Sequence, residues 1–301
     1  MPISRRAFLG FAALAAGCSA AGGPAPELRL ATGSVGGPYE QFGDRLAVEL
    51  RREGLAVRVL RTAASVQNLA MMAGGRADAG FALADSADDA VRLRHQPVSA
   101  LARVYLNYVH LVTRRGAGIA AVGDLAGRAV SIGEEGSGTA VTATRVLAAA
   151  GLAAPPEVSR LALETSIEAL RGGGIDAFFW SGGVPTPALA SLGDIELVPL
   201  ESLVPVLRRR FGPVYEPVSV PAHVYGGAKP VPTVGTPSYL MCRTGLPDDL
   251  AYTVTETLFS ARDRLQAPSA PGGRLDSRYA ISTGVVPLHP GAARYYRSVY
   301  G

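Results

Sequence analysis

Three segments of the chain each combine a short β-like run, a loop of small residues and the start of a helix-like pattern. They are residues 31–39, 62–68 and 133–139. The first turn of a helix leaves backbone N–H groups without partners and carries a partial positive charge. Because small residues let a ligand approach that backbone, each segment predicts a site for a carboxylate or phosphate that needs no Lys or Arg.

The polar residues of these loops are the predicted ligands of an anion. We expect the carboxylate to bind N–H groups near Ser65 and at Ser137, Gly138 and Thr139. The alternative for Ser65 and Thr139 is simple helix capping, which is common for Ser and Thr in this position. Three such loops, two in the first half of the chain and one in the second, favour a shared cleft.

Four further residues could contact the rest of the ligand. Tyr39 and Trp180 would pack on its apolar part, with core aromatics as the alternative. Asn68 and Asp85 would orient an amine or hydroxyl group, although Asp85 could equally be a helix cap.

Motifs for catalysis are missing from these loops. Residues 133–139 lack the Gly-Lys-Ser/Thr of a nucleotide-hydrolase loop, and residues 33–37 do not match Gly-x-Gly-x-x-Gly. Ser137 lacks nucleophile-elbow spacing, and the four histidines show no metal-ligand spacing. We therefore expect a binding protein and no enzyme, with no metal and no cofactor.

The N-terminus has the pattern of an export signal. Arg5 and Arg6 precede a short apolar run, so residues 1–17 are predicted to be a signal peptide. The two arginines are compatible with export by the twin-arginine route, and export by the general secretory route stays an alternative. Cys18 follows Leu-Ala-Ala-Gly, which resembles a lipobox and predicts lipidation of Cys18; the alternative is cleavage near Ala21 with loss of Cys18. Residues 18–27 would be a flexible tether, and the protein a periplasmic, membrane-anchored lipoprotein.

Composition narrows the class further. Hydrophobic residues make up 48% of the 301 positions and charged residues 18%, which is ample for a packed core. Removal of Arg5 and Arg6 with the signal lowers the net charge from +4 to +2. No basic stripe is interleaved with aromatics, so we expect no nucleic-acid partner. Cys242 would be an unpaired core residue.

The elements that must position the loops alternate along the chain. Residues 28–83 predict a βαβαβ unit with a parallel sheet, and the pattern restarts near residue 125 after an extended segment, 102–114. Residues 199–237 show low periodicity, whereas residues 248–266 and 290–300 predict helices. The predicted division places the first lobe at 28–110 and 226–301 and the second lobe at 111–225. We expect closure about the extended segments 111–114 and 239–243.

Taken in order, the motifs resemble the TAXI family, receptors of tripartite ATP-independent periplasmic (TRAP) transporters. The segments that carry the resemblance are residues 31–39, 65–69, 81–86, 133–139, 176–185 and 287–292. The resemblance implies a type II periplasmic-binding-protein fold with two α/β lobes and an interlobe ligand cleft. It also implies a TRAP permease as partner, small organic acids such as glutamate or 2-oxoglutarate as ligands, and Gly183 as a further site residue. We expect a monomer.

This chain departs from the family pattern in the presumed cleft loops. Ala63 and Ala64 replace glycines, Gln67 replaces Glu, and Asn107 with its preceding Leu replaces a Pro-Glu pair. The particular ligand is therefore left open. Two other functions also stay open: a periplasmic sensor that signals to a kinase, and an enzyme on the same two-lobed fold.

Overall fold

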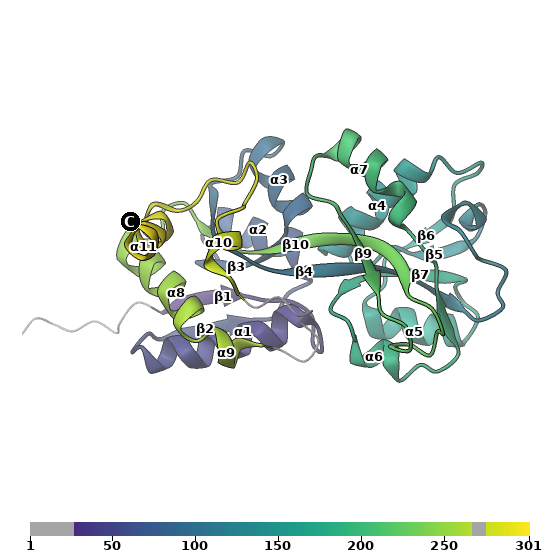
Figure 1. The fold of residues 1–301 in the computed structure, drawn as a ribbon, viewed down its shortest axis with the longest axis horizontal. Helices are drawn as coiled ribbons and strands as arrows, with labels where there is room; N and C mark the ends of the chain where they lie inside the picture. Colours follow the sequence, from purple (N-terminus) through teal and green to yellow (C-terminus); the bar gives the residue numbers. More distant parts are fainter. Residues whose placement is uncertain (1–26, 267–274) are drawn as a thin grey trace, which may run out of the picture.

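The computed structural model describes residues 27–266 and 275–301 (Figure 1). The predicted signal peptide (1–17), the lipobox Cys18 and nearly all of the predicted tether (18–27) lie outside the described residues. Within the described ranges, no helix combines the length and apolar character needed to cross a membrane.

The first lobe contains a parallel three-stranded unit in the order β2-β1-β3. Its elements are β1 (Leu28–Ala31), α1 (Pro38–Arg52), β2 (Val57–Leu60), α2 (Ser65–Ala73), β3 (Ala79–Leu83) and α3 (Ala84–Arg92). Apolar residues recur on one face of α1, and Phe42, Leu46 and Leu50 bury that face in the core. The βαβαβ pattern is confirmed, and α3 is a helix that the sequence pattern did not indicate.

The second lobe repeats the α/β arrangement, with β5 parallel to both β6 and β7. Its elements are a 3₁₀ turn (Val122–Leu125), β5 (Ala129–Ser131), α4 (Gly138–Ala150), β6 (Glu157–Ser159), α5 (Leu163–Arg171), β7 (Ala177–Gly182), α6 (Pro187–Ala190), β8 (Ile195–Leu197), a second 3₁₀ turn (Glu201–Leu203), α7 (Val204–Phe211) and β9 (Glu216–Val220). The segment 199–237 is thus more regular than its sequence indicates. Its one α-helix, α7, buries only Val204 and Leu207, too few positions to produce a clear period.

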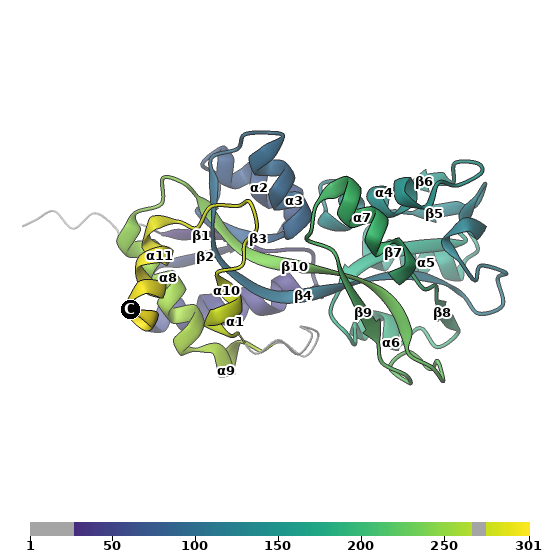
Figure 2. The same ribbon diagram turned by 45° about the horizontal axis from the view of Figure 1, so that its top comes forward.

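Two long antiparallel strands, β4 (Val98–Arg114) and β10 (Val231–Arg243), run through both lobes (Figures 1 and 2). In the first lobe β10 pairs with β3; in the second, β4 pairs with β7 and β8, and β10 pairs with β9. The result is one sheet in the order β2-β1-β3-β10-β4-β7-β5-β6, with β8 and β9 beside β4 and β10.

The crossing between the lobes lies near residues 105–108 of β4 and 235–238 of β10, which pair with each other. The predicted hinge segments lie elsewhere: residues 111–114 pair with β7 and β8, and residues 239–242 pair with β3. Those segments are therefore fixed inside the lobes, since their backbone groups are already used in lobe pairing. The predicted lobe limits at residues 110 and 225 fall within β4 and between β9 and β10 and stay predictions.

The C-terminal helices return to the first lobe, as the sequence predicted (Figure 1). They are α8 (Asp248–Ser260), α9 (Arg262–Leu265), α10 (Ser277–Ala280) and α11 (Pro290–Tyr300). Phe259 of α8 stacks on Tyr295 of α11 with ring centroids 5.5 Å apart. Cys242 on β10 is fully buried in the same core, and burial raises the pKa of its thiol.

A buried carboxylate, Asp78 just before β3, links β1 to the long strand β10. Asp78 accepts hydrogen bonds from the Nε atoms of Arg29 and Arg243, each at 2.9 Å, and from the Arg29 backbone N–H at 3.0 Å. Burial alone would raise the pKa of Asp78, but the hydrogen bonds from Arg29 and Arg243 overcome it and hold the pKa at about 2.

Replacement of Asp78 should therefore lower stability in a pH-dependent way. Because the folded pKa is depressed, the ionised carboxylate stabilises the fold above about pH 4, and this contribution is lost as the pH falls toward 2. Asp78→Asn should cost about 1–2 kcal/mol at pH 7, allowing for solvent screening. Urea unfolding at pH 7 and pH 3 measures it. Asp44→Asn, at an exposed pair with Arg61, is the control; equal losses for both variants would refute the prediction.

Candidate ligand-binding site

A pocket lies between the two lobes, where the segments after β1, β2, β5 and β6 meet the C-terminal half of β7. Its lining residues fall within five segments, 33–39, 63–65, 133–139, 161–163 and 179–181, together with Leu83 and Asn107. The enclosed volume is about 50 Å³, and one water needs roughly 10–15 Å³ on this measure. The pocket in this conformation therefore accepts a ligand with few non-hydrogen atoms.

Six of the nine predicted site residues line this pocket. They are Tyr39, Ser65, Ser137, Gly138, Thr139 and Trp180. The other three, Asn68, Asp85 and Gly183, do not line it. The structure thus brings together loops from both halves of the chain, while ligand contact by these six residues stays a prediction.

The N-terminus of α4 is the part of the pocket best suited to an anion. Ser137 caps the helix by accepting the Ala140 N–H at 3.1 Å. The next two N–H groups, those of Gly138 and Thr139, lie in the first turn, where a helix offers no carbonyl partner. The Thr139 hydroxyl accepts the Ser181 N–H at 3.2 Å, so its proton is free to be donated.

The N-terminus of α2 is used differently from the prediction. The Gly136 carbonyl of the second lobe accepts the N–H groups of Val66 and Gln67 at 3.0 and 3.1 Å. Ser65 Oγ accepts the Leu83 N–H at 3.0 Å, which leaves its hydroxyl proton as the group it can offer a ligand. Two amides of α2, those of Val66 and Gln67, therefore join the lobes, and the N–H and hydroxyl groups of Ser65 are the donors left for a ligand at this helix start.

The two predicted aromatic contacts are both partly committed to the protein. Tyr39 is buried, stacks on Phe81 with centroids 5.3 Å apart, and shares a hydrogen bond with Ser238 at 3.0 Å. Burial raises the pKa of the Tyr39 hydroxyl, so it stays protonated at neutral pH. Trp180 donates its indole N–H to Thr186 Oγ1 at 3.0 Å and presents the rest of its ring to the pocket.

The three residues outside the pocket have structural contacts. Asn68 is fully buried and donates its amide to the carbonyls of Thr32 and Phe81 at 2.6 and 2.8 Å, which holds α2 to β1 and β3. Gly183 accepts the Thr186 hydroxyl at 2.7 Å. Asp85 is buried between α3 and α4. Sequence reasoning could not separate these residues from ligand contacts, because loop position alone does not show which way a side chain points.

Several lining residues were missed as ligand contacts by the sequence analysis. Ser34, Asn107, Glu134 and Ser181 line the pocket. Asn107 is on β4, and the only sequence signal for its place in the pocket was a departure from the family pattern. Its side chain is 1% exposed and donates a hydrogen bond to the Ser238 hydroxyl. Among the described residues that line the pocket, none is Arg, Lys or His. The lining therefore offers helix amides, hydroxyl groups and the Asn107 side chain as polar groups, and Glu134 is its one carboxylate among the described residues.

The chain belongs to the NMT1-like family, whose model matches residues 30–299. Similar solved structures include a substrate-binding protein of an amino acid ABC transporter, 12% identical over 79% of this chain and 94% of that chain, with a TM-score of 0.52. Another is XAC2383 from Xanthomonas citri bound to ATP, 16% identical over 91% of this chain and 95% of that chain, with a TM-score of 0.53. A third is the alkanesulfonate-binding protein SsuA from Xanthomonas axonopodis pv. citri bound to MOPS, 16% identical over 91% of this chain and 85% of that chain, with a TM-score of 0.51.

These likenesses show the fold. The predicted type II periplasmic-binding-protein fold, with two α/β lobes and an interlobe cleft, is confirmed by the neighbours and by the topology of the sheet. Membership of the TAXI family within this wider group stays a prediction.

One departure in the cleft loops has a measurable cost. Ala64 adopts φ 87° and ψ −134°, a region that disfavours a Cβ atom by of order 1–3 kcal/mol. Ala64→Gly should therefore raise the free energy of unfolding by about 1 kcal/mol. Its neighbour Ala63 has no positive φ, so Ala63→Gly should instead lower stability by about 0.4–1 kcal/mol. Urea unfolding decides, and a stability loss in both variants would contradict the strain argument.

The contact between the lobes at Gly138 should be sensitive to a single methyl group. A Cβ added to Gly138 would collide with Ser65 Oγ and lie 2.8 Å from Leu83 Cδ1, both in the first lobe. Gly138→Ala should therefore separate the pocket walls and shift the emission of Trp180, the single Trp in the sequence, to longer wavelength. Gly123→Ala is the control, because its Cβ meets no atom within 4 Å. Identical emission from both variants would show that the walls are not in contact.

Proposed function

We propose that this protein is an extracytoplasmic solute receptor that captures a small organic anion and delivers it to a membrane permease. The observation that carries the proposal is the pocket between the two lobes, with the first turn of α4 among its lining residues. Enclosure between lobes favours reversible capture, because lobe movement can admit and release the ligand. Within the described part of the chain, the residues that line the pocket include no Asp, Cys, His, Lys or Arg.

The pocket chemistry supports a carboxylate ligand of small size. Helix N–H groups at Gly138 and Thr139, with the hydroxyl groups of Ser65 and Thr139, supply donors on one side. An enclosed volume of about 50 Å³ favours short acids over long ones. Within the predicted classes, amino acids and keto or dicarboxylic acids, the short members are therefore the first candidates.

The delivery partner and cellular location are proposed from the sequence. The ordered TAXI-like motifs support a TRAP permease as the partner, whereas one structural neighbour is described as part of an amino acid ABC transporter. The export signal (1–17) and Cys18 support a periplasmic, lipid-anchored monomer.

A ligand screen tests the capture function directly. The purified protein is heated with short and long carboxylic, 2-oxo, dicarboxylic and amino acids, and the melting temperature is recorded. A specific ligand at 100 times its dissociation constant adds about 2.7 kcal/mol, which corresponds to a rise of roughly 5–10 °C for a protein of this size. Quenching or a shift of Trp180 emission on titration gives an independent reading of the same pocket.

A matched pair of variants ties the signal to the pocket. Thr139→Val removes the pocket hydroxyl and keeps the side-chain shape, so it should weaken binding about tenfold, the loss of one hydrogen bond to a charged group. Thr144→Val lies on the same helix but outside this pocket and should leave affinity unchanged. The anion-receptor function is refuted if no acid shifts the melting temperature, or if Thr144→Val alone weakens binding.

A further inference from the structure

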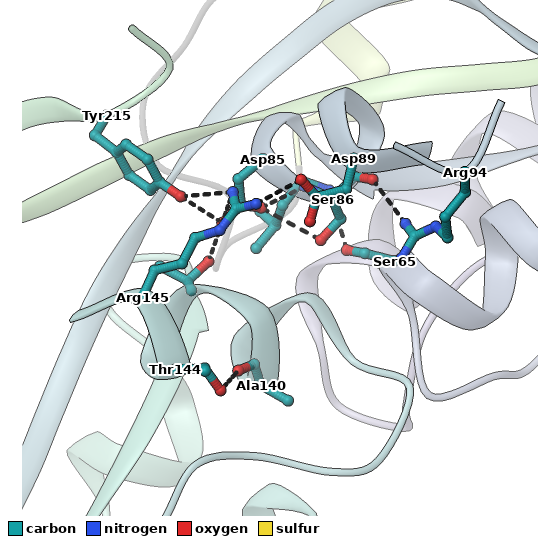
Figure 3. Close-up of polar contacts among 11 residues, drawn as sticks. Ser65, Asp85, Ser86, Asp89, Arg94, Ala140, Thr144, Arg145 and Tyr215 are labelled. Carbon is teal, nitrogen blue, oxygen red and sulfur yellow. Dashed lines mark hydrogen bonds and ion pairs between the residues drawn. The ribbon is translucent and has the colours of Figure 1, made fainter. Parts of the chain in front are cut away.

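A cluster of polar side chains joins the two lobes on the side of α4 away from the pocket. Arg145 of α4 donates to Asp89 Oδ1 at 2.5 Å and to the Tyr215 hydroxyl at 2.9 Å (Figure 3). Asp89 belongs to α3 of the first lobe, whereas Arg145 and Tyr215 belong to the second. Only 12% of the Arg145 side chain is exposed, so solvent screens the ion pair weakly.

Asp85, one turn earlier on α3, is the buried centre of this cluster. Its Oδ2 atom accepts the Thr142 hydroxyl at 2.6 Å and the Tyr215 hydroxyl at 3.2 Å, and it lies 4.0 Å from the Arg145 guanidinium. All three groups belong to the second lobe. Burial raises the pKa of Asp85, and the positive charge of Arg145 acts in the opposite direction.

The geometry makes these contacts depend on the arrangement of the lobes. Asp85 has no exposed surface. Its Oδ1 atom accepts the N–H and hydroxyl groups of Ser86 in its own lobe, whereas both donors to its Oδ2 atom and its nearest cation come from across the lobe interface. A buried carboxylate that loses its partners is costly unless water replaces them. When the lobes separate, the hydrogen bonds and ion pairs between them break and water solvates each group instead. The cluster therefore forms only when the lobes are close together.

The cluster and the pocket share one rigid element. Arg145 lies six residues after Thr139 on α4, a distance of about 9 Å along the helix axis. The Gly136 carbonyl, just before α4, also contacts the first lobe through the N–H groups of Val66 and Gln67. Contacts at Arg145 and at Gly136 thus fix the tilt of α4, and with it the position of the helix N-terminus in the pocket.

We propose that Arg145 is a positioning residue that holds the lobes in the ligand-binding arrangement through Asp85, Asp89 and Tyr215. The link to affinity rests on the proposed solute-receptor function, whereas the link to lobe arrangement does not. Apparent affinity scales with the fraction of molecules in the competent arrangement. A variant that lowers this fraction tenfold raises the apparent dissociation constant tenfold without any change in the pocket.

The test compares Arg145→Gln with Arg160→Gln. Arg160 pairs with Glu135 within the second lobe and lines the same side of the interface, so it controls for loss of one positive charge. Small-angle X-ray scattering of the ligand-free proteins gives the radius of gyration, and titration of the best acid from the ligand screen gives the affinity. Asp89→Asn, which keeps Arg145 and leaves Asp85 untouched, is the milder second variant.

We expect Arg145→Gln and Asp89→Asn to increase the radius of gyration and to weaken binding at least tenfold, with Arg160→Gln unchanged. Arg145→Lys, which keeps the charge but loses the forked geometry, should recover part of the affinity. If Arg145→Gln does not fold, Asp89→Asn decides alone. An unchanged radius in folded variants overturns the proposal. If the wild-type protein binds no acid, the solute-receptor function fails, and the scattering comparison still decides the role of Arg145.

Discussion

The antiparallel pairing of β4 with β10 is the constraint on which the rest of this molecule depends. These two strands are the only sheet connection between the lobes within the described residues, and every other described strand pairs, directly or through neighbours, onto them. Backbone hydrogen bonds cannot be left unmade in a buried sheet, so each lobe keeps its strands in fixed register. Freedom between the lobes is confined to the short stretch where the pair crosses from one lobe to the other.

This arrangement explains why small residues gather at the pocket. The parallel strands β1, β2, β5 and β6 are followed by segments that line the cleft beside β7, and the lobes approach closely there. Gly138 packs against Ser65 and Leu83 of the opposite lobe with no room for a Cβ atom. Glycine at this position is required by contact between the lobes, and its lack of a side chain also leaves the first helix amides of α4 accessible to a ligand.

Two buried aspartates show different solutions to the same electrostatic problem. Asp78 accepts hydrogen bonds from two arginines of its own lobe, and these bonds hold its pKa at about 2. Asp85 is bonded at Oδ1 by Ser86 of its own lobe, but its Oδ2 atom depends on two hydroxyl groups and one guanidinium from the other lobe, and burial raises its pKa. Asp78 stabilises the first lobe whatever the relative position of the two lobes. Asp85 links a buried charge to the relative position of the lobes.

The sequence by itself determined the local elements and the class of fold. Periodicity predicted the βαβαβ unit over residues 28–83 and the last helix over 290–300, which are the bounds in the structure. The spacing of the small-residue loops predicted a cleft between two α/β lobes, because strand-loop-helix order places such loops at one edge of a sheet. Six of the nine expected site residues lie in that cleft. Only the tertiary structure decided that Asn68 and Asp85 turn away from it, that two α2 amides are taken by the Gly136 carbonyl, and that Asn107 lines it. The reason is physical: local pattern specifies which face of an element is apolar, whereas the partner of a polar group depends on which distant segment the folded chain places beside it.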